Sequence, residues 1–307
     1  MIKVTLKDGS VKEFPAGISA YEAAKEISTG LARNACAAKI NGKNADLRDT
    51  LNEDCELEIL TFDDEYGKRT FRHTASHIMA QAVKRLYPHA KLAIGPAVDD
   101  GFYYDFDLET KFTPEDLAKI EAEMKKIVKE DIKLERSYKS RNEAVEFFKE
   151  KNEPYKVELA EDIPEGEDIS FYTQGEFTDL CAGAHLMSTG AVKAFKLTSA
   201  TGAYWRGDSS KKMLCRVYGT AFPKASELEA HLNMLEEAKK RDHNKLGREL
   251  ELFTTVDIIG QGLPIMLPKG AKIIQILQRF VEDEEARRGW QLTKTPYMAK
   301  RELYKLS

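Results

Sequence analysis

Two short segments with paired histidine and cysteine side chains place the strongest constraint on how this chain folds. His73 and His77 lie four positions apart in FRHTASHIMAQAV, and Cys181 and His185 lie four positions apart in FTDLCAGAH. The first segment reads as a helix, so its two histidines leave the same face one turn apart. Imidazole and thiolate ligands suit a tetrahedral zinc ion, and neighbouring imidazoles also suit a site that activates water. Either site needs partners from elsewhere, so the fold has to bring these distant segments together.

Each pair also has an ordinary structural explanation. His73 and His77 could flank a core helix and donate hydrogen bonds to carbonyl groups, and a buried cysteine is most often a small apolar side chain. The apolar stripe that starts with Phe71 and Ala75 runs beside the histidines, which places them at the border of the core, where they could line a cleft. Asp179 lies close to the cysteine and could orient a histidine, as carboxylates do around metal sites.

Composition limits the class of protein. The chain has 307 residues, of which 42% are apolar and 32% charged, as in soluble globular proteins of two or three domains. It has no apolar run of about 18 residues and no apolar signal-peptide core, so we expect a cytoplasmic protein without a membrane span. Four widely spaced cysteines also favour a reducing compartment. The net charge of −4 means that any nucleic-acid contact needs a local basic patch.

Residues 1–61 have the order of a small β-grasp, ubiquitin-like domain. IKVTLKDGSVKEF alternates polar and apolar residues around an Asp-Gly pair, which predicts a hairpin with a two-residue turn. SAYEAAKEI follows with helical spacing and a capping box from Ser19 to Glu22. Short strands are expected around an Asn-Gly turn and in CELEIL. A docking role and a purely structural role are equally compatible with these residues.

Residues 62–225 are expected to form an α+β domain that starts with the helix of the histidine pair. PEDLAKIEAEMKKIVKE reads as a strongly amphipathic helix, and SRNEAVEFFKEK reads as a helix with a capping box. Strands are predicted in FYYDFDL, IKLERSY, YKVELAED, ISFYTQGEFTDLC, AVKAFKLTSATGAYWRGD and KKMLCRVYGTAF.

Residues 226–248 are expected to form one charged linker helix that opens with a capping box from Ser226 to Glu229. Its basic end is either solvated or faces RNA. Residues 249–307 contain paired glycines and prolines, a long amphipathic helix and a predicted strand in WQLTKTPYM. The chain stops a few residues into another helical pattern, which suggests the front part of a longer protein. The fold class is α+β with several domains.

Five segments together resemble the N-terminal half of the threonyl-tRNA synthetase family: RHTASHIMAQAV, IGPAVDDGFYYDF, EFTDLCAGAH, AYWRGDSSKKMLCRVYGTAF and RDHNKLGRELELF. They follow the family's order and span nearly the whole chain. The resemblance implies a TGS domain at 1–61 and, at 62–225, an editing domain shared with alanyl-tRNA synthetases. It further implies that 249–307 begins a class II catalytic domain with an antiparallel sheet, including motif 1.

One departure from the family lies between the reactive cysteine and histidine. The family commonly reads DLCRGPH, whereas this chain has Ala182 and Ala184 at the arginine and proline positions. Both reactive positions are kept. The lost arginine could weaken an RNA or phosphate contact, and the site geometry could be slightly looser.

The resemblance implies a chemistry for the site. The parent enzyme attaches threonine to its tRNA with ATP, and its editing domain hydrolyses seryl-tRNA made by mistake. Serine lacks one methyl group of threonine, which is worth only about 1–3 kcal/mol of discrimination, so a second site has to remove the wrong product. The catalytic residues implied are His73, His77, Lys156, Asp179, Cys181 and His185, with Tyr104 and Tyr172 as substrate-binding residues.

The implied partner is the acceptor end of tRNA, with its 3′-terminal adenosine carrying a seryl or threonyl group. The parent enzyme is expected to be a homodimer through its catalytic domain. Editing is expected to need no cofactor and no metal. Zinc stays possible, because these ligand types hold zinc in the alanyl editing domain, and its ligands would be His73, His77, Cys181 and His185. The ATP, magnesium and zinc of the parent ligase are expected to bind in the C-terminal part.

Two other functions stay open. The first is a non-catalytic tRNA-binding or regulatory module with a degenerate editing site, which a seryl-tRNA deacylation assay would distinguish. The second is a zinc-dependent hydrolase of a small molecule. Metal analysis together with activity on an ester without RNA would distinguish that function.

The chain should not form threonyl-tRNA by itself. Motifs 2 and 3, which bind ATP in class II synthetases, are not found in it. No histidine follows His243 and no cysteine follows Cys215, so the family's threonine-binding zinc site has no ligands here. We expect no ATP–pyrophosphate exchange with threonine from the purified chain, and detectable exchange would contradict this expectation.

Overall fold

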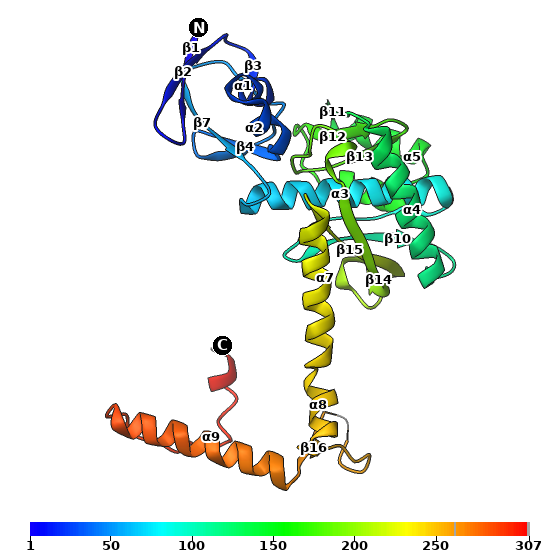
Figure 1. The fold of residues 1–307 in the computed structure, drawn as a ribbon. Helices are drawn as coiled ribbons and strands as arrows, with labels where there is room; N and C mark the ends of the chain where they lie inside the picture. The colour runs from blue at the N-terminus through cyan, green and yellow to red at the C-terminus, as the bar shows by residue number, and fades with distance from the viewer. Residues whose placement is uncertain (261, 306–307) are drawn as a thin grey trace. The chain divides into compact units, whose positions relative to one another are not determined.

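The computed structural model describes residues 1–260 and 262–305 (Figure 1). The chain forms two compact units, Met1–His231 and Leu232–Ser307. Within the first unit, we call residues 1–61 the first module and residues 62–225 the second domain. The expected α+β class and β-grasp order are confirmed. Within the described residues, no helix is both long and apolar enough to cross a membrane.

The first module is a five-stranded sheet in the order β2-β1-β7-β4-β5, in which only β1 and β7 pair in parallel. Its strands are β1 (Ile2–Leu6), β2 (Val11–Phe14), β4 (Ala37–Ile40), β5 (Lys43–Ala45) and β7 (Cys55–Leu60). The helices are α1 (Ala20–Ile27) and α2 (Thr29–Asn34), and a small antiparallel pair joins β3 (Ile18–Ser19) to β6 (Thr50–Leu51). The predicted capping box from Ser19 to Glu22 is present at the start of α1.

The hairpin between β1 and β2 is longer at its turn than the sequence predicted. Leu6 donates its N–H to the carbonyl of Ser10 at 2.8 Å, which leaves residues 7–9 in the loop. Gly9 has a φ of +81°, a left-handed conformation that glycine adopts without steric cost. A loop of this length with glycine at the left-handed position is the second common hairpin class, so the two-residue prediction was wrong.

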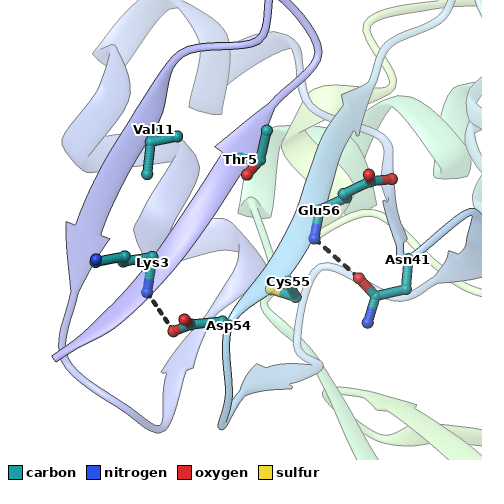
Figure 2. A pocket seen from close by; sticks show the side chains of 7 residues that line it. All are labelled: Lys3, Thr5, Val11, Asn41, Asp54, Cys55 and Glu56. Carbon is teal, nitrogen blue, oxygen red and sulfur yellow. Dashed lines mark hydrogen bonds between the residues drawn. The ribbon is translucent and has the colours of Figure 1, made fainter.

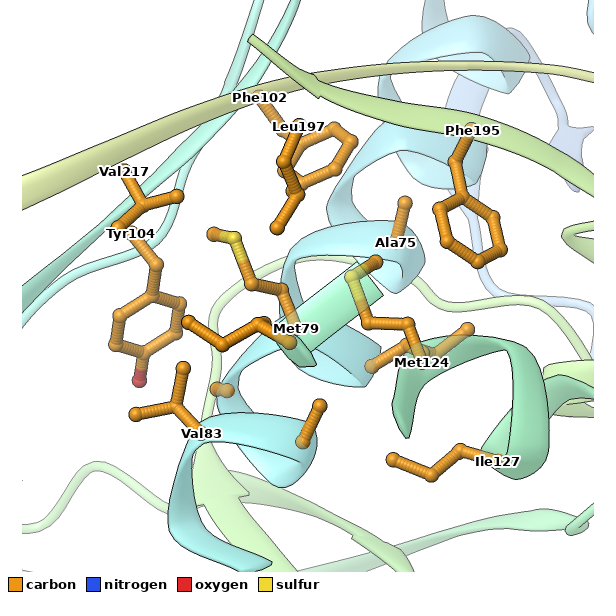
Figure 3. Close-up of a cluster of buried hydrophobic side chains, with 14 of the residues drawn as sticks. Ala75, Met79, Val83, Phe102, Tyr104, Met124, Ile127, Phe195, Leu197 and Val217 are labelled. Atoms are coloured by element: carbon orange, nitrogen blue, oxygen red, sulfur yellow. The ribbon is translucent and has the colours of Figure 1, made fainter. Parts of the chain in front are cut away.

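The core of the second domain packs helices α3 (Glu65–Leu86) and α4 (Pro114–Glu130) against a sheet in the order β14-β15-β10-β8, with β9 beside β10. The strands are β8 (Lys91–Leu92), β9 (Ala97–Val98), β10 (Gly101–Asp107), β14 (Ala194–Tyr204) and β15 (Met213–Phe222). The strand predicted in AVKAFKLTSATGAYWRGD ends earlier than expected, at Tyr204, because a 3₁₀ turn at Trp205–Gly207 follows it. Figure 3 shows Ala75, Met79 and Val83 of α3 pointing into this core. This packing fixes the rotation of α3, and so the direction in which its histidines leave the helix.

A smaller sheet in the same domain has the order β11-β12-β13. It consists of β11 (Leu134–Lys139), β12 (Ile169–Gln174) and β13 (Phe177–Leu180), with helices α5 (Arg141–Glu150) and α6 (Pro154–Glu161) and a 3₁₀ turn at Thr189–Ala191. Phe148 of α5 stacks on Phe171 of β12 with ring centroids 5.4 Å apart. The predicted capping box of α5 is present.

Helix α6 corrects the sequence-based prediction of a strand in YKVELAED. Pro154 occupies the first turn of the helix, where its fixed φ suits helical geometry and its missing N–H costs nothing. Lys156 and Ala160, one turn apart, are both buried. The short alternation of polar and apolar residues fits one face of a helix as well as a strand, and packing between α5 and α6 decides the outcome.

The predicted single linker helix is two helices, α7 (Ala225–Lys240) and α8 (His243–Glu249). Asp242 interrupts them, because its carboxylate accepts a hydrogen bond from the N–H of Lys245 at 2.9 Å and caps the new helix. Ser226 lies inside α7, so it does not form the predicted capping box with Glu229.

The second unit also contains the pair β16 (Phe253–Thr254) and β17 (Ile265–Met266), helix α9 (Pro268–Arg287) and a 3₁₀ turn at Leu303–Lys305. The strand predicted in WQLTKTPYM does not form, because a strand needs a pairing partner and the described residues supply none there. The apolar residues Ile276 and Phe280 of α9 are exposed. The predicted domain 249–307 includes positions 261, 306 and 307, which lie outside the described residues.

Replacing Gly95 by alanine should destabilise the second domain. A Cβ atom at this position would lie 2.0 Å from a ring carbon of Tyr104, so the buried ring would have to move. Overpacking of this kind costs about 1–3 kcal/mol. Urea unfolding should show a lower midpoint at an unchanged slope.

The matched control is Gly30→Ala in helix α2, where the nearest atom to the added Cβ is 3.5 Å away. Alanine is the better helix former, so this variant should be unchanged or up to about 1 kcal/mol more stable. Equal stability of the two variants would show that Gly95 is not needed for close packing against Tyr104.

Candidate functional site

The structure brings the two reactive pairs together. His73 and His77 leave one face of α3, and Cys181 and His185 lie in the segment that follows β13. One donor atom from each of the four residues lies within 4.8 Å of the other three. The Sγ atom of Cys181 is 3.2 Å from the Nε2 atom of His73 and 3.2 Å from the Nε2 atom of His185. We call these four residues the His/Cys cluster.

The cluster is enclosed except at one residue. His185 is fully buried and His77 is 2% exposed, whereas His73 is partly exposed. The rings of His77 and His185 have centroids 4.2 Å apart, and those of His73 and His185 are 4.6 Å apart. Solvent or a ligand therefore meets the cluster through His73.

The protonation of the cluster follows from this burial. Loss of hydration, reinforced by the cations of Lys156 and Arg69, lowers the pKa of His73 to about 4. Burial also places the pKa of His77 and of His185 well below the ordinary value. Burial raises the pKa of the Cys181 thiol to about 12. Near pH 7 the cluster therefore holds three neutral imidazoles and a protonated thiol.

Thr74 fixes the tautomer of His185. Its hydroxyl donates to the carbonyl of Thr70 at 3.0 Å, so its oxygen accepts from the N–H of Leu186 at 3.0 Å and from Nδ1 of His185 at 3.2 Å. The ring proton of His185 is therefore on Nδ1, and its Nε2 lone pair faces Cys181. Of two acceptors near the thiol proton of Cys181, Nε2 of His185 at 3.2 Å is nearer than the carbonyl of Gly183 at 3.7 Å, so we assign the proton to His185.

A buried ion pair lies beside the cluster. The ammonium of Lys156 is 2.7 and 2.8 Å from the two carboxylate oxygens of Asp179, and both side chains are almost fully buried. Tyr104 donates its hydroxyl to the same carboxylate at 2.6 Å, and Nε2 of His77 is 4.0 Å away. Removing either charge would leave the other unpaired in a buried site, which is strongly unfavourable.

Tyr172 completes the set of eight residues that the sequence pointed to, and all eight lie in one buried region. Its ring packs against that of His185 with centroids 4.4 Å apart. Its hydroxyl is not bonded to Asp179, the strand neighbour of Tyr172. It donates instead to Asp46 of the first module at 2.9 Å.

Sequence reasoning missed three residues that contact this region: Asp46, Arg48 and Thr74. Thr74 lies between the two histidines in HTASH, and a hydroxyl one position after a reactive histidine was a signal that could have been followed. Asp46 and Arg48 lie in a polar loop of the first module, NADLRDT, and nothing in that loop indicates a distant contact.

The donor set of the His/Cys cluster fits a zinc ion. Imidazole nitrogen and thiolate sulfur are both ordinary zinc ligands, and four of them complete a tetrahedral site. The two sulfur–nitrogen distances of 3.2 Å are close to the ~3.5 Å separation that ~2.3 Å zinc–sulfur and ~2.0 Å zinc–nitrogen bonds imply. His73, His77, Cys181 and His185 would therefore hold the metal with small movements.

A separate hollow lies on the sheet of the first module (Figure 2). Its lining includes Lys3, whose N–H donates to Asp54, and Glu56, whose N–H donates to Asn41. None of its lining residues belongs to the His/Cys cluster or touches it. This hollow is therefore not part of the candidate site.

Comparison with known proteins places these features in a family. Residues 2–61 match the TGS domain family, and residues 169–218 match the family described as the threonyl and alanyl tRNA synthetase second additional domain. The chain is 63% identical over 307 residues to a threonine–tRNA ligase of Clostridium perfringens (strain SM101 / Type A), covering 100% of this chain and 47% of the relative. It is 59% identical over 304 residues to that of Acetivibrio thermocellus, covering 99% of this chain and 48% of the relative.

The chain belongs to the threonyl-tRNA synthetase family. It spans about half the length of the curated relatives that it matches and corresponds to their N-terminal part. The family indicated by the sequence motifs is thereby confirmed. The second additional domain match contains Cys181 and His185, whereas His73 and His77 precede it.

The free energy of unfolding should fall as the pH is lowered from 7 to 5. In the unfolded chain the three histidines of the cluster have pKa values near 6.5 and take up protons, whereas loss of hydration keeps them neutral in the folded chain. The unfolded state binds more protons, so acid favours it. This contribution is fully present above about pH 6.5 and is lost as the pH falls toward the lowered folded-state pKa, about 4 for His73. The slope should reach about 2–4 kcal/mol per pH unit near pH 5.5.

Urea unfolding at several pH values measures this slope. The variant His77→Gln should have a smaller slope than the parent chain, because one buried imidazole is gone. The control His89→Gln replaces an exposed histidine and should keep the parent slope. A stability that does not change between pH 7 and 5 would mean that the imidazoles are already charged or hydrated in the folded chain.

Proposed function

We propose that residues 62–225 hydrolyse the ester bond of seryl-tRNA, as the editing domain of a threonine–tRNA ligase. The observation that carries the proposal is the convergence of the His/Cys cluster beside the buried pair of Lys156 and Asp179. The proposed partner is the acceptor end of tRNA in the cytoplasm. The proposed parent enzyme joins threonine to that tRNA with ATP and magnesium, as a homodimer.

His73 is the residue that we assign to the attacking water. The thiol proton of Cys181 is directed to His185, so the sulfur accepts the Nε2–H of His73 at 3.2 Å. This leaves the Nδ1 lone pair of His73 free to accept a proton from water. A Cβ atom at position 183 would lie 3.2 Å from Nδ1, and the glycine that occurs there keeps this space open.

The reaction then follows ordinary ester hydrolysis. Water loses a proton to Nδ1 of His73 and bonds to the seryl carbonyl carbon. The bond from that carbon to the ribose oxygen breaks, and the proton passes to the ribose oxygen, which releases serine and tRNA. General base help of this kind contributes about 10²–10⁴-fold in rate.

We assign to Lys156 the stabilisation of the negative charge that develops on the ester during hydrolysis. Lys156 lowers the pKa of both His73 and His77, so its field reaches the cluster. Asp179 holds the ammonium in place together with Tyr104. Such a preorganised donor in a buried site can stabilise an oxyanion or hold a ribose hydroxyl.

Burial gives His73 and His185 different roles. His185 is fully buried and both of its ring nitrogens are engaged, so we assign it to holding Cys181. His77 fills the space between His185 and Asp179. If zinc is bound by the cluster, it would supply a Lewis acid for water or the ester carbonyl.

Replacing His73 by alanine should slow deacylation of seryl-tRNA by about 10²–10⁴-fold. Because His73 lies at the open side of the cluster, the free energy of unfolding should change by no more than about 1 kcal/mol. Single-turnover release of labelled serine from seryl-tRNA measures the rate.

The control variant His89→Ala, at an exposed position, should keep the parent rate. Gly183→Ala should also slow the reaction, because the added methyl group would occupy the space at Nδ1 of His73. If the parent chain binds tRNA but releases no serine, the domain is a binding module and the proposal is wrong. Unchanged rates in both His73→Ala and Gly183→Ala would remove His73 from the chemistry.

A further inference from the structure

The loop of the first module between β5 and β6 reaches the wall of the candidate site. Asp46 is 4% exposed, and the side chain of its neighbour Arg48 is 13% exposed. Both residues belong to the module that the sequence left without an assigned role. Their contacts go mainly to residues more than 80 positions away in the chain.

Asp46 holds two residues of the site. One carboxylate oxygen, Oδ2, accepts from the hydroxyl of Tyr172 at 2.9 Å and from the backbone N–H of His185 at 3.3 Å. The guanidinium of Arg48 binds both carboxylate oxygens at 3.0 and 3.2 Å. The charge of Asp46 is therefore paired, and its direction is fixed from three sides.

Arg48 holds the segment that carries the reactive histidine. Its guanidinium donates to the backbone carbonyls of Leu134 at 2.7 and 3.1 Å, of His185 at 3.0 Å and of Leu186 at 2.8 Å. It also lies over the ring of Tyr172, 5.6 Å from its centroid. The residue thus joins strand β11 to the segment around His185.

We propose that Asp46 and Arg48 are positioning residues for the hydrolytic site, so that the site is complete only when the first module is docked. This inference rests on the proposed function. Tyr172 packs on His185, His185 holds Cys181, and Cys181 lies against His73. A displacement of Tyr172 or of the His185 backbone therefore reaches the proposed base through direct contacts.

The same interface supplies a matched control. Asp49, three residues after Asp46, forms an ion pair with Arg136 at 2.6 Å. Neither residue touches the His/Cys cluster or the pair of Lys156 and Asp179. Asp49 also accepts a hydrogen bond from the backbone N–H of Asp46 at 2.8 Å, which the amide oxygen of an asparagine can keep. Asp49→Asn therefore removes the ion pair with Arg136 but leaves the side-chain contacts of Asp46 to Tyr172 and His185 in place.

The experiment uses three variants of the whole chain: Asp46→Asn, Tyr172→Phe and the double variant that carries both. Asp49→Asn is the control. Single-turnover release of serine from seryl-tRNA is measured at saturating and subsaturating enzyme, which separates the maximal rate from the apparent affinity. Asp46→Asn and Tyr172→Phe should each lower the maximal rate by about 10–100-fold, as loss of an orienting hydrogen bond does around reactive histidines. Asp49→Asn should stay within about twofold of the parent.

The maximal rate of the double variant distinguishes the two explanations most clearly. Because Asp46 acts through the hydroxyl of Tyr172, the double variant should lose little more rate than Asp46→Asn alone. If the rate losses of the two single variants multiply in the double variant, Asp46 acts independently of Tyr172, as a general structural residue. A rate loss in Asp49→Asn equal to that in Asp46→Asn would lead to the same conclusion. If Asp46→Asn does not fold, Tyr172→Phe decides, because it keeps the buried charge pair; an unchanged rate in that variant overturns the proposal.

Failure of the proposed function is recognised separately. It shows as absence of serine release by the parent chain in the same assay. In that case the ¹⁵N signals of the His185 ring decide the positioning role. A shift of those signals in Asp46→Asn but not in Asp49→Asn supports it, and unchanged signals in both variants overturn it.

Discussion

The buried carboxylate of Asp179 is the interaction on which the rest of the site depends. It holds the ammonium of Lys156 from α6 and the hydroxyl of Tyr104 from β10, and it lies 4.0 Å from His77 of α3. One charge therefore ties three separate elements to strand β13. Because an unpaired charge could not stay in this interior, the elements either assemble around Asp179 or do not pack. The His/Cys cluster forms at the edge of that assembly.

Burial gives the cluster its chemistry. Loss of hydration keeps the imidazoles neutral and the thiol protonated, so a lone pair on His73 is present at any pH near 7. An imidazole with such a lowered pKa is a weak base. In the proposed site the nearby cation of Lys156 compensates, together with a chain of hydrogen bonds of fixed direction that runs from Thr74 through His185 and Cys181 to His73. The hydrogen bond from the backbone N–H of His185 to Asp46 connects this chain of hydrogen bonds to the first module. The β-grasp module thereby has a role in the proposed chemistry beyond docking.

The sequence predicted those parts of the fold that depend on local rules. The capping box at Ser19 and the convergence of the histidine and cysteine pairs could be inferred, because caps are local and shared chemistry implies a shared site. The strand predicted around Lys156 was wrong, because a short alternating segment fits a helix equally well and tertiary packing decides. The capping box at Ser226 failed because α7 starts earlier. The role of Asp46 was not predictable, since a polar loop carries no mark of a partner in another domain.

The measurement that tests this account most directly is a pH titration of the assigned ¹⁵N imidazole signals of His73, His77 and His185 in the whole chain. The account predicts that His185 stays neutral, with its proton on Nδ1, at pH values where an ordinary imidazole is already charged, and that His73 takes up its proton only near pH 4. It also predicts that Asp46→Asn changes the His185 signals. Protonation of His73 and His185 near pH 6.5, or a proton on Nε2 of His185, would contradict an enclosed, neutral hydrolytic site.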